Sequence, residues 1–143
     1  MLTVNDLMTL DPFTVFETAT LREVQTLMRV EGYRQLPVVT ESGELAGIVT
    51  DRDLRLALNS PMLGEKWMNE TVLDNVRVNN VMTSNPICVT PDTPAYEAAE
   101  MLGVYKFGGM PVVDNGVLLG IISVTDFLEF FAENHKPETI EVA

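Results

Sequence analysis

Apolar residues along the chain alternate between the spacing of a helix and the spacing of a strand. Residues 36–40 and 45–50 are short runs of aliphatic and β-branched residues, and the polar turn 41–43 between them predicts a hairpin. After the hairpin, residues 51–58 predict a helix with apolar residues one turn apart. Before it, another helix is predicted by apolar residues three or four positions apart: Leu21, Val24, Leu27 and Met28.

Polar residues and glycine mark the ends of these elements. Thr20 and Glu23 have the spacing of a capping box, and Gly32 is a typical helix stop. A short helical turn is expected over 4–8 and a short extended segment over 14–16. The predicted order in the first 58 residues is therefore β-α-β-β-α after the helical turn.

The same order recurs in the second half of the chain. Met8 and Met82 are 82 − 8 = 74 positions apart, and Asp53 and Asp126 are 126 − 53 = 73 positions apart. Other residues match at the offset of 74: Val4 with Val78, Asn5 with Asn79, Thr9 with Thr83, Pro12 with Pro86, Val15 with Val89, and Pro37 with Pro111. The one-residue change falls in the hairpin turn, where insertions are tolerated. The chain is therefore an internal duplication.

Local signals are clearer in the second copy. Thr93-Pro94 predicts a helix start with Thr93 as N-cap, and Asn115-Gly116 predicts a two-residue hairpin turn. A last helix is expected over 125–133. We divide the chain into a first motif (1–58), a linker (59–75), a second motif (76–134) and a frayed tail (135–143).

The two motifs are expected to depend on each other. A motif of roughly 60 residues buries too little apolar surface to be more than marginally stable alone. We therefore predict an α/β (α+β) protein, in which two β-α-β-β-α motifs pack sheet to sheet around a pseudo-twofold axis.

Composition excludes several classes of function. Of the 143 residues, 46% are hydrophobic and 21% charged, as in globular proteins. The net charge of −12 disfavours nucleic acid, whose phosphates require a basic surface. No apolar run approaches the roughly 20 residues of a membrane helix, and the N-terminus lacks the features of a signal peptide. A single cysteine, Cys88, forms no internal disulfide and fits the cytoplasm. The expected protein is cytoplasmic, with no membrane or nucleic-acid partner.

The candidate ligand-binding residues lie at two corners of the chain, where each hairpin leads into a helix. Thr50 and Asp53 stand three positions apart at the first corner, as do Ser123 and Asp126 at the second. A helix N-terminus attracts anions, and an aspartate in the first turn can accept hydrogen bonds from ribose hydroxyls. Helix capping alone explains either corner. Two copies at matching positions favour a nucleotide-binding role.

These motifs resemble a tandem pair of CBS domains, the modules named after cystathionine β-synthase and also called a Bateman module. The resemblance covers about residues 1–58 and 76–134. No single motif is specific to the family, but two ordered sets of motifs in the same frame are highly specific. The matching segments are Met8-Thr9 with Pro12, Leu36-Pro37-Val38-Val39, Gly47-Ile48-Val49-Thr50 and Asp53, then Met82-Thr83 with Pro86, Met110-Pro111-Val112-Val113, Gly120-Ile121-Ile122-Ser123 and Asp126.

The resemblance implies a regulatory module with two clefts for AMP, ADP, ATP or S-adenosylmethionine. Asp51 and Asp53 are too poorly placed to bind a metal as a pair, so Mg²⁺ is expected only through ligand phosphates. The resemblance implies ribose-binding roles for Asp53 and Asp126, and a hydroxyl role for Thr50 and Ser123; Thr125 adjoins the second corner. It also implies adenine contacts from apolar residues, although residues of these types are more often core than ligand contacts: Val15, Phe16, Leu36, Ile87, Cys88 and Met110.

Charge distinguishes the two corners. Arg34, Arg52 and Arg55 lie within a few residues of the first corner, while the second has Lys106 and the acidic Glu129 nearby. We expect the tighter nucleotide site at Asp53 and a less charged ligand, or none, at Asp126. A solvated helix face is the alternative explanation of Arg52 and Arg55. An Arg52 side chain that reaches across to the second cleft or to a partner subunit would undo this asymmetry.

Alternative functions are a structural dimerisation module with empty clefts and, least favoured, an enzyme. No catalytic residue or metal site is predicted, because His135 lies alone in the tail and Cys88 has no histidine or basic neighbour in sequence. A homodimer is expected through apolar residues of the second helices: Leu54, Leu58, Phe127, Phe130 and Phe131. The sequence does not name the regulated partner protein.

Overall fold

The computed structural model describes residues 1–58 and 66–137, which form two β-sheets with helices on their outer sides. Residues 59–65 of the predicted linker and residues 138–143 of the predicted tail lie outside the described residues. The elements in chain order are α1 (Val4–Leu7), β1 (Thr9–Leu10), β2 (Val15–Phe16), α2 (Leu21–Glu31), β3 (Gln35–Val39), β4 (Leu45–Thr50), α3 (Asp51–Leu58), α4 (Lys66–Asn75), the 3₁₀ turn η1 (Val78–Asn80), β5 (Thr83–Ser84), α5 (Ala95–Tyr105), β6 (Gly109–Asp114), β7 (Val117–Ser123) and α6 (Val124–Asn134).

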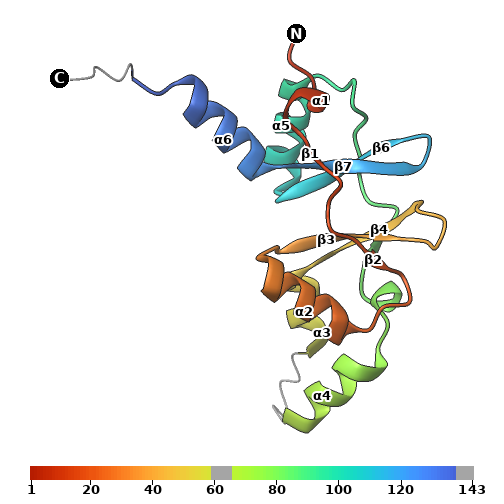
Figure 1. The fold of residues 1–143 in the computed structure, drawn as a ribbon. Coiled ribbons are helices and arrows are strands. Elements are labelled where there is room, and N and C mark those ends of the chain that lie inside the picture. Colours follow the sequence, from red (N-terminus) through yellow and green to blue (C-terminus); the bar gives the residue numbers. More distant parts are fainter. Residues whose placement is uncertain (59–65, 138–143) are drawn as a thin grey trace.

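The two sheets face each other at the centre of the molecule, as Figure 1 shows. Helices α2, α3 and α4 lie outside one sheet, α1 and α5 lie outside the other, and α6 projects from the side (Figure 1). The predicted fold class, two related α/β motifs packed sheet to sheet, is confirmed. Among the described helices, none is both long and apolar enough to cross a membrane.

Local signals in the sequence place most element ends correctly. The Thr20 hydroxyl accepts a hydrogen bond from the Glu23 amide at 3.2 Å, so the predicted capping box forms. Gly32 ends α2 with φ of 75°, a left-handed conformation that favours glycine. Asn115 and Gly116 have φ of 52° and 80°, which are the two positive values of the predicted tight turn.

The start of α5 differs from the prediction. The helix begins at Ala95 with Pro94 as its N-cap, one residue later than Thr93-Pro94 suggested. The Thr93 hydroxyl instead accepts a hydrogen bond from the Thr90 amide at 3.1 Å. It closes the preceding turn and therefore does not cap the helix.

Each sheet is built mainly from one repeat and includes one short strand from the other repeat. One sheet has the order β2-β3-β4-β5, and the other has the order β1-β7-β6. Strand β1 of the first repeat pairs with β7 of the second, with Thr9 opposite Ile121. Strand β5 of the second repeat pairs with β4 of the first, with Thr83 opposite Ile48. The two repeats thus exchange their first strands.

Glycine makes this exchange possible at two matching positions. A Cβ on Gly120 would lie less than 3.0 Å from the Thr9 carbonyl oxygen. A Cβ on Gly47 would lie 2.6 Å from the Thr83 carbonyl oxygen. Atoms do not approach this closely without one of them moving, so only glycine lets the exchanged strands lie so near.

The exchange continues at the helix N-termini. The Val4 amide donates to the Thr93 carbonyl at 2.8 Å, and the Val78 amide donates to the Ala19 carbonyl at the same distance. Each repeat therefore begins by docking on the first long helix of the other. The motif boundaries drawn from the sequence stay a prediction, because backbone pairing crosses them.

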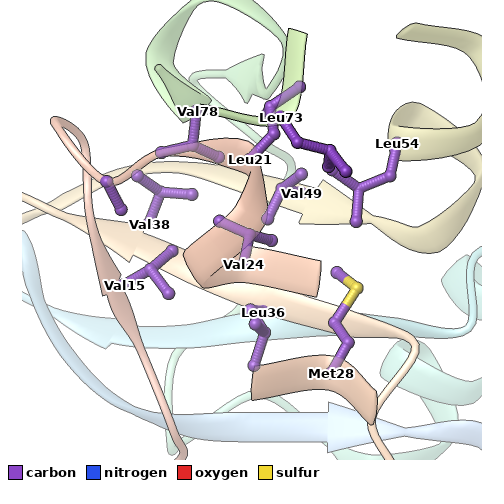
Figure 2. Close-up of a cluster of buried hydrophobic side chains, with 11 residues drawn as sticks. Val15, Leu21, Val24, Met28, Leu36, Val38, Val49, Leu54, Leu73 and Val78 are labelled. Atoms are coloured by element: carbon purple, nitrogen blue, oxygen red, sulfur yellow. The ribbon is translucent and has the colours of Figure 1, made fainter. Parts of the chain in front are cut away.

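Two hydrophobic clusters stabilise the fold, and they differ in size. The first contains eleven buried residues, among them Leu73 of α4, which packs with Leu21 and Leu54 (Figure 2). An ion pair from Arg22 to Asp74, with 2.5 Å between Nε and Oδ1, also joins α2 to α4. The second cluster contains seven buried residues, and α6 contributes none of them.

Candidate functional site

A cavity of about 670 Å³ lies where the two repeats meet. Residues of both repeats line it: Thr9, Pro12, Phe13, Gly32, Tyr33, Arg34, Gln35, Leu36, Pro37, Thr50 and Asp51 from the first, and Gly108, Ile121, Ser123, Val124, Thr125, Asp126 and Glu129 from the second. Its size is within the range of small-molecule sites. Neither repeat forms this cavity alone.

The second hairpin-to-helix corner provides its polar end. The Asp126 Oδ2 atom accepts hydrogen bonds from the Ser123 amide at 2.8 Å and from the Ser123 hydroxyl at 3.0 Å. Its Oδ1 atom accepts one from the Thr9 hydroxyl of the exchanged strand at 3.0 Å. A carboxylate has about four acceptor positions, so Asp126 caps α6 and keeps capacity for a ligand hydroxyl. The amides of the first turn of α6 add positive potential here.

Residues before and along β3 provide an apolar and aromatic part of the lining. Phe13 and Tyr33 are in ring contact, with centroids 5.7 Å apart and planes tilted by 47°. Pro12 and Leu36 line the cavity with them. Such surfaces suit a flat heteroaromatic base, because bases stack on aromatic and aliphatic side chains.

The charges on this cavity are mainly negative. Arg34 is its one cationic side chain among the described residues, and Asp51, Asp126 and Glu129 are acidic, so the formal sum is 1 − 3 = −2. The Arg34 carbonyl accepts a hydrogen bond from the Asp51 amide at 2.8 Å, which fixes the backbone of Arg34 beside the end of β4. The cavity thus offers one cation to a phosphate and opposes several negative charges.

The first corner has the same local geometry in different surroundings. The Asp53 carboxylate accepts from the Thr50 amide at 2.9 Å, and the Thr50 hydroxyl accepts from the Asp53 amide at 3.1 Å. Neither Asp53 nor Arg52 lines the 670 Å³ cavity. Arg52 and Arg55 line a separate, shallow hollow along α3.

Arg34 lines the shared cavity with residues of both corners, Thr50 of the first and Asp126 of the second. The sequence grouped Arg34 with Asp53, because Arg34 precedes the first hairpin. The structure puts Arg34 on the cavity that contains Asp126, since the two repeats face each other there. Which corner binds nucleotide more tightly stays a prediction.

Six of the predicted site residues line one cavity: Arg34, Leu36, Thr50, Ser123, Thr125 and Asp126. The others lie elsewhere. Val15 is 8% exposed and Met110 is 0% exposed, and each belongs to a hydrophobic cluster. Phe16 is 54% exposed, while Ile87 and Cys88 lie on the segment after β5. The ligand contacts predicted for these residues stay predictions.

Cys88 and His135 each contact a residue of their own segment. The Cys88 thiol donates to the Pro86 carbonyl at 3.1 Å, and burial raises the pKa of the thiol, so it is protonated at neutral pH. His135 stacks on Phe131 with ring centroids 4.3 Å apart. Within residues 1–58 and 66–137, no three His, Cys, Asp or Glu side chains are grouped as metal ligands.

Several lining residues were absent from the predicted site. Phe13, Tyr33 and Gln35 carry no motif, so the sequence held no signal for them. Thr9 and Pro12 recur in the second copy as Thr83 and Pro86, and that repetition was the available signal. It became meaningful only with the strand exchange, which brings Thr9 to Asp126.

One known protein family matches both repeats of the chain. The family model for the CBS domain matches residues 4–60 and 78–133. A CBS domain-containing protein of Dictyostelium discoideum is 37% identical over 138 residues, which are 94% of each chain. The inosine-5′-monophosphate dehydrogenase of Korarchaeum cryptofilum is 33% identical over 126 residues, which are 87% of this chain but 23% of that enzyme.

Two solved structures are similar over nearly the whole chain. CBSX2 in complex with AMP is 27% identical with a TM-score of 0.80, and the match covers 95% of this chain and 100% of that one. The CBS domain pair of MJ0100, in complex with 5′-methylthioadenosine and S-adenosylmethionine, is 25% identical with a TM-score of 0.75 over 92% and 97% of the two chains. The repeat, the two facing sheets and these matches together show that the chain belongs to the CBS-domain family and is a tandem pair of CBS domains.

Proposed function

We propose that this CBS pair is a regulatory module that binds an adenosyl ligand in the cavity between its repeats. The observation that supports this most directly is the shared cavity, in which the Asp126 corner of one repeat and the Phe13–Tyr33 pair of the other line one space. Similar CBS pairs have been solved with AMP, or with 5′-methylthioadenosine and S-adenosylmethionine.

Each part of the ligand has a matching group in the cavity. The ribose hydroxyls donate to the Asp126 carboxylate, which Thr9 and Ser123 hold in place. The adenine lies against Phe13 and Tyr33. The 5′ substituent faces the first turn of α6, where Thr125 lines the cavity and the positive end of the helix attracts anions.

Ligand charge should differ between the two corners. With a formal charge of −2, the Asp126 cavity favours 5′-methylthioadenosine, S-adenosylmethionine or AMP over ATP, and Arg34 is its partner for a single phosphate. The Asp53 corner, with Arg52 next to it, favours AMP, ADP or ATP, and Mg²⁺ would enter there with the phosphates.

A regulatory role fits a chain that has no catalytic constellation in its described residues. Ligand binding between the repeats would change how they sit against each other, and a partner protein would respond to that change. The enzyme relative supports this division of labour, because the matching region is a minor part of its length. The alternative function is a structural dimerisation module without a ligand.

We also propose a homodimer. No residue of α6 is buried, and Leu128 and Phe131 are each 62% exposed. The proposed interface is formed by these apolar side chains of α6 together with the exposed Leu56 of α3.

Calorimetric titration with 5′-methylthioadenosine, S-adenosylmethionine, AMP and ATP tests the binding function. Asp126→Asn should weaken ligands of the shared cavity about tenfold or more, because a charged acceptor contributes about 1.5–3 kcal/mol. Asp53→Asn changes the same capping geometry at the other corner, so it should leave the binding of 5′-methylthioadenosine in the shared cavity unchanged. If wild type binds none of the four ligands at millimolar concentration, the adenosyl-binding function is overturned. A turnover assay with the same ligands addresses the enzyme alternative.

A further inference from the structure

Gln35 is the only amide side chain among the described residues that line the shared cavity. It is the first residue of β3, lies opposite Thr50 in the hairpin and is half-buried. Its side chain makes no hydrogen bond with any described residue. A donor and an acceptor are therefore both available at the cavity, next to its apolar and aromatic lining.

The position of this amide is set by a glycine in the other repeat. Gly109 is the counterpart of Gln35, because 109 − 35 = 74, the offset of the repeat. A Cβ on Gly109 would lie less than 3.0 Å from the Gln35 Nε2 atom. The Gln35 side chain thus crosses from the first repeat and lies in the space where its counterpart would have a side chain. The pseudo-twofold symmetry is broken at this pair, so only one glutamine amide exists there.

We propose that Gln35 is a specificity-determining residue, which reads the adenine of the ligand at its N6 and N7 atoms. The Oε1 atom of Gln35 accepts from the N6 amino group, and Nε2 donates to N7. This pair of hydrogen bonds is the geometry in which glutamine recognises adenine. Hypoxanthine has two acceptors on the same edge, O6 and N7, so one hydrogen bond is lost and two acceptors face each other. The inference rests on the proposed adenosyl function and adds the residue that selects the base.

Neutral nucleosides test this without a change in phosphate charge. The probes are adenosine, inosine and 7-deazaadenosine, which lacks the N7 acceptor. Wild type should bind adenosine about tenfold more tightly than either analogue, since a bidentate contact of this kind discriminates by about 1–3 kcal/mol. Gln35→Leu should bring the three affinities together, mainly by weakening adenosine.

Gly109→Ala provides a second variant that leaves Gln35 in the chain. The added methyl group displaces the amide, so adenosine should lose its advantage although the glutamine is still present. Gly103→Ala is the control, because Gly103 lies on α5 with nothing within 4 Å of the added Cβ. It should keep the wild-type ratio of adenosine to inosine affinity.

The outcomes separate this inference from the function on which it rests. If wild type binds neither adenosine nor any other adenosyl ligand, the proposed function fails. If wild type binds adenosine, inosine and 7-deazaadenosine equally well, only the assignment of Gln35 is overturned. The same conclusion follows if wild type prefers adenosine and the folded Gln35→Leu variant keeps that preference. A urea transition of normal midpoint establishes that each variant is folded.

Discussion

The same chemical change, glycine to alanine, should have opposite effects at two positions of this chain. Gly120 lies in β7, where a Cβ would meet the Thr9 carbonyl oxygen of the exchanged strand at less than 3.0 Å. Gly103 lies within α5, where nothing is within 4 Å of an added Cβ. Gly120→Ala must therefore push β1 away, while Gly103→Ala adds a methyl group in open space.

The expected magnitudes follow from these surroundings. Overpacking against backbone costs about 1–3 kcal/mol, and the lower conformational entropy of the unfolded alanine chain returns about 0.4–1 kcal/mol. Combining those two ranges gives a loss of about 0–2.6 kcal/mol in the free energy of unfolding for Gly120→Ala, and the upper part of the range is expected because the clash is with backbone. Gly103→Ala should raise it by about 0.8–1.0 kcal/mol, the difference in helix propensity.

Urea unfolding followed by circular dichroism measures both effects. The midpoints of the two variants should lie on opposite sides of wild type, with similar m-values, because the change is in stability and not in the surface exposed on unfolding. Gly47→Ala should resemble Gly120→Ala, since its Cβ would meet the Thr83 carbonyl oxygen at 2.6 Å. A Gly120→Ala protein as stable as wild type would refute the close approach of β1 to β7, and with it the strand exchange.

Three further predictions concern the ligand, the assembly and pH. Arg34→Met should weaken AMP about tenfold and leave 5′-methylthioadenosine nearly unchanged, because only AMP has a phosphate to pair with the guanidinium; equal losses in calorimetry would remove Arg34 from the phosphate site. Phe131→Glu should convert the dimer to a monomer in sedimentation at micromolar concentration, whereas Val30→Glu on the exposed face of α2 should not; a monomeric wild type would contradict the proposed dimer. Hydrogen bonding to Arg22 lowers the pKa of Asp74 below 3.8, so this carboxylate stabilises the fold above its unfolded pKa, and the effect is lost as pH falls through the lowered pKa. Asp74→Asn should therefore be less stable than wild type at pH 7 in urea unfolding, with the difference shrinking below about pH 3.8; a gap that is constant with pH would show that the ion pair contributes nothing.

The candidate site was predicted in part, and the division has a physical cause. Asp126, Ser123 and Thr50 were found because each helix start is a local feature with its own capping residues. Phe13 and Tyr33 were missed, because an aromatic residue in a loop has no spacing that distinguishes a cavity wall from an exposed surface. Arg34 was predicted for the first corner only, whereas in the structure it also lines the cavity of Asp126, because the two repeats face each other there.

The sequence by itself determined the two hairpins, most of the helices and their duplication, but it did not predict α4 or the short exchanged strands β1 and β5. Helix and strand periods, the Thr20 cap, Gly32 and the Asn115-Gly116 turn act over a few residues, so they can be read without knowledge of the fold. The offset of the copies, 74 positions before the hairpin turn and 73 after it, then predicted the pseudo-twofold arrangement. These features depend on local backbone preference and on the need to bury one face of each element.

Only the tertiary structure decided which residues share a cavity. Strand exchange brings Thr9 to Asp126, and the facing sheets bring Gln35 to Gly109, across separations of 117 and 74 positions. No local pattern encodes these contacts, because they depend on how two complete motifs pack. The glycines at positions 47, 109 and 120 show this most clearly: each could be recognised as a repeat match or a strand residue, but the atom that excludes its side chain lies in the other repeat.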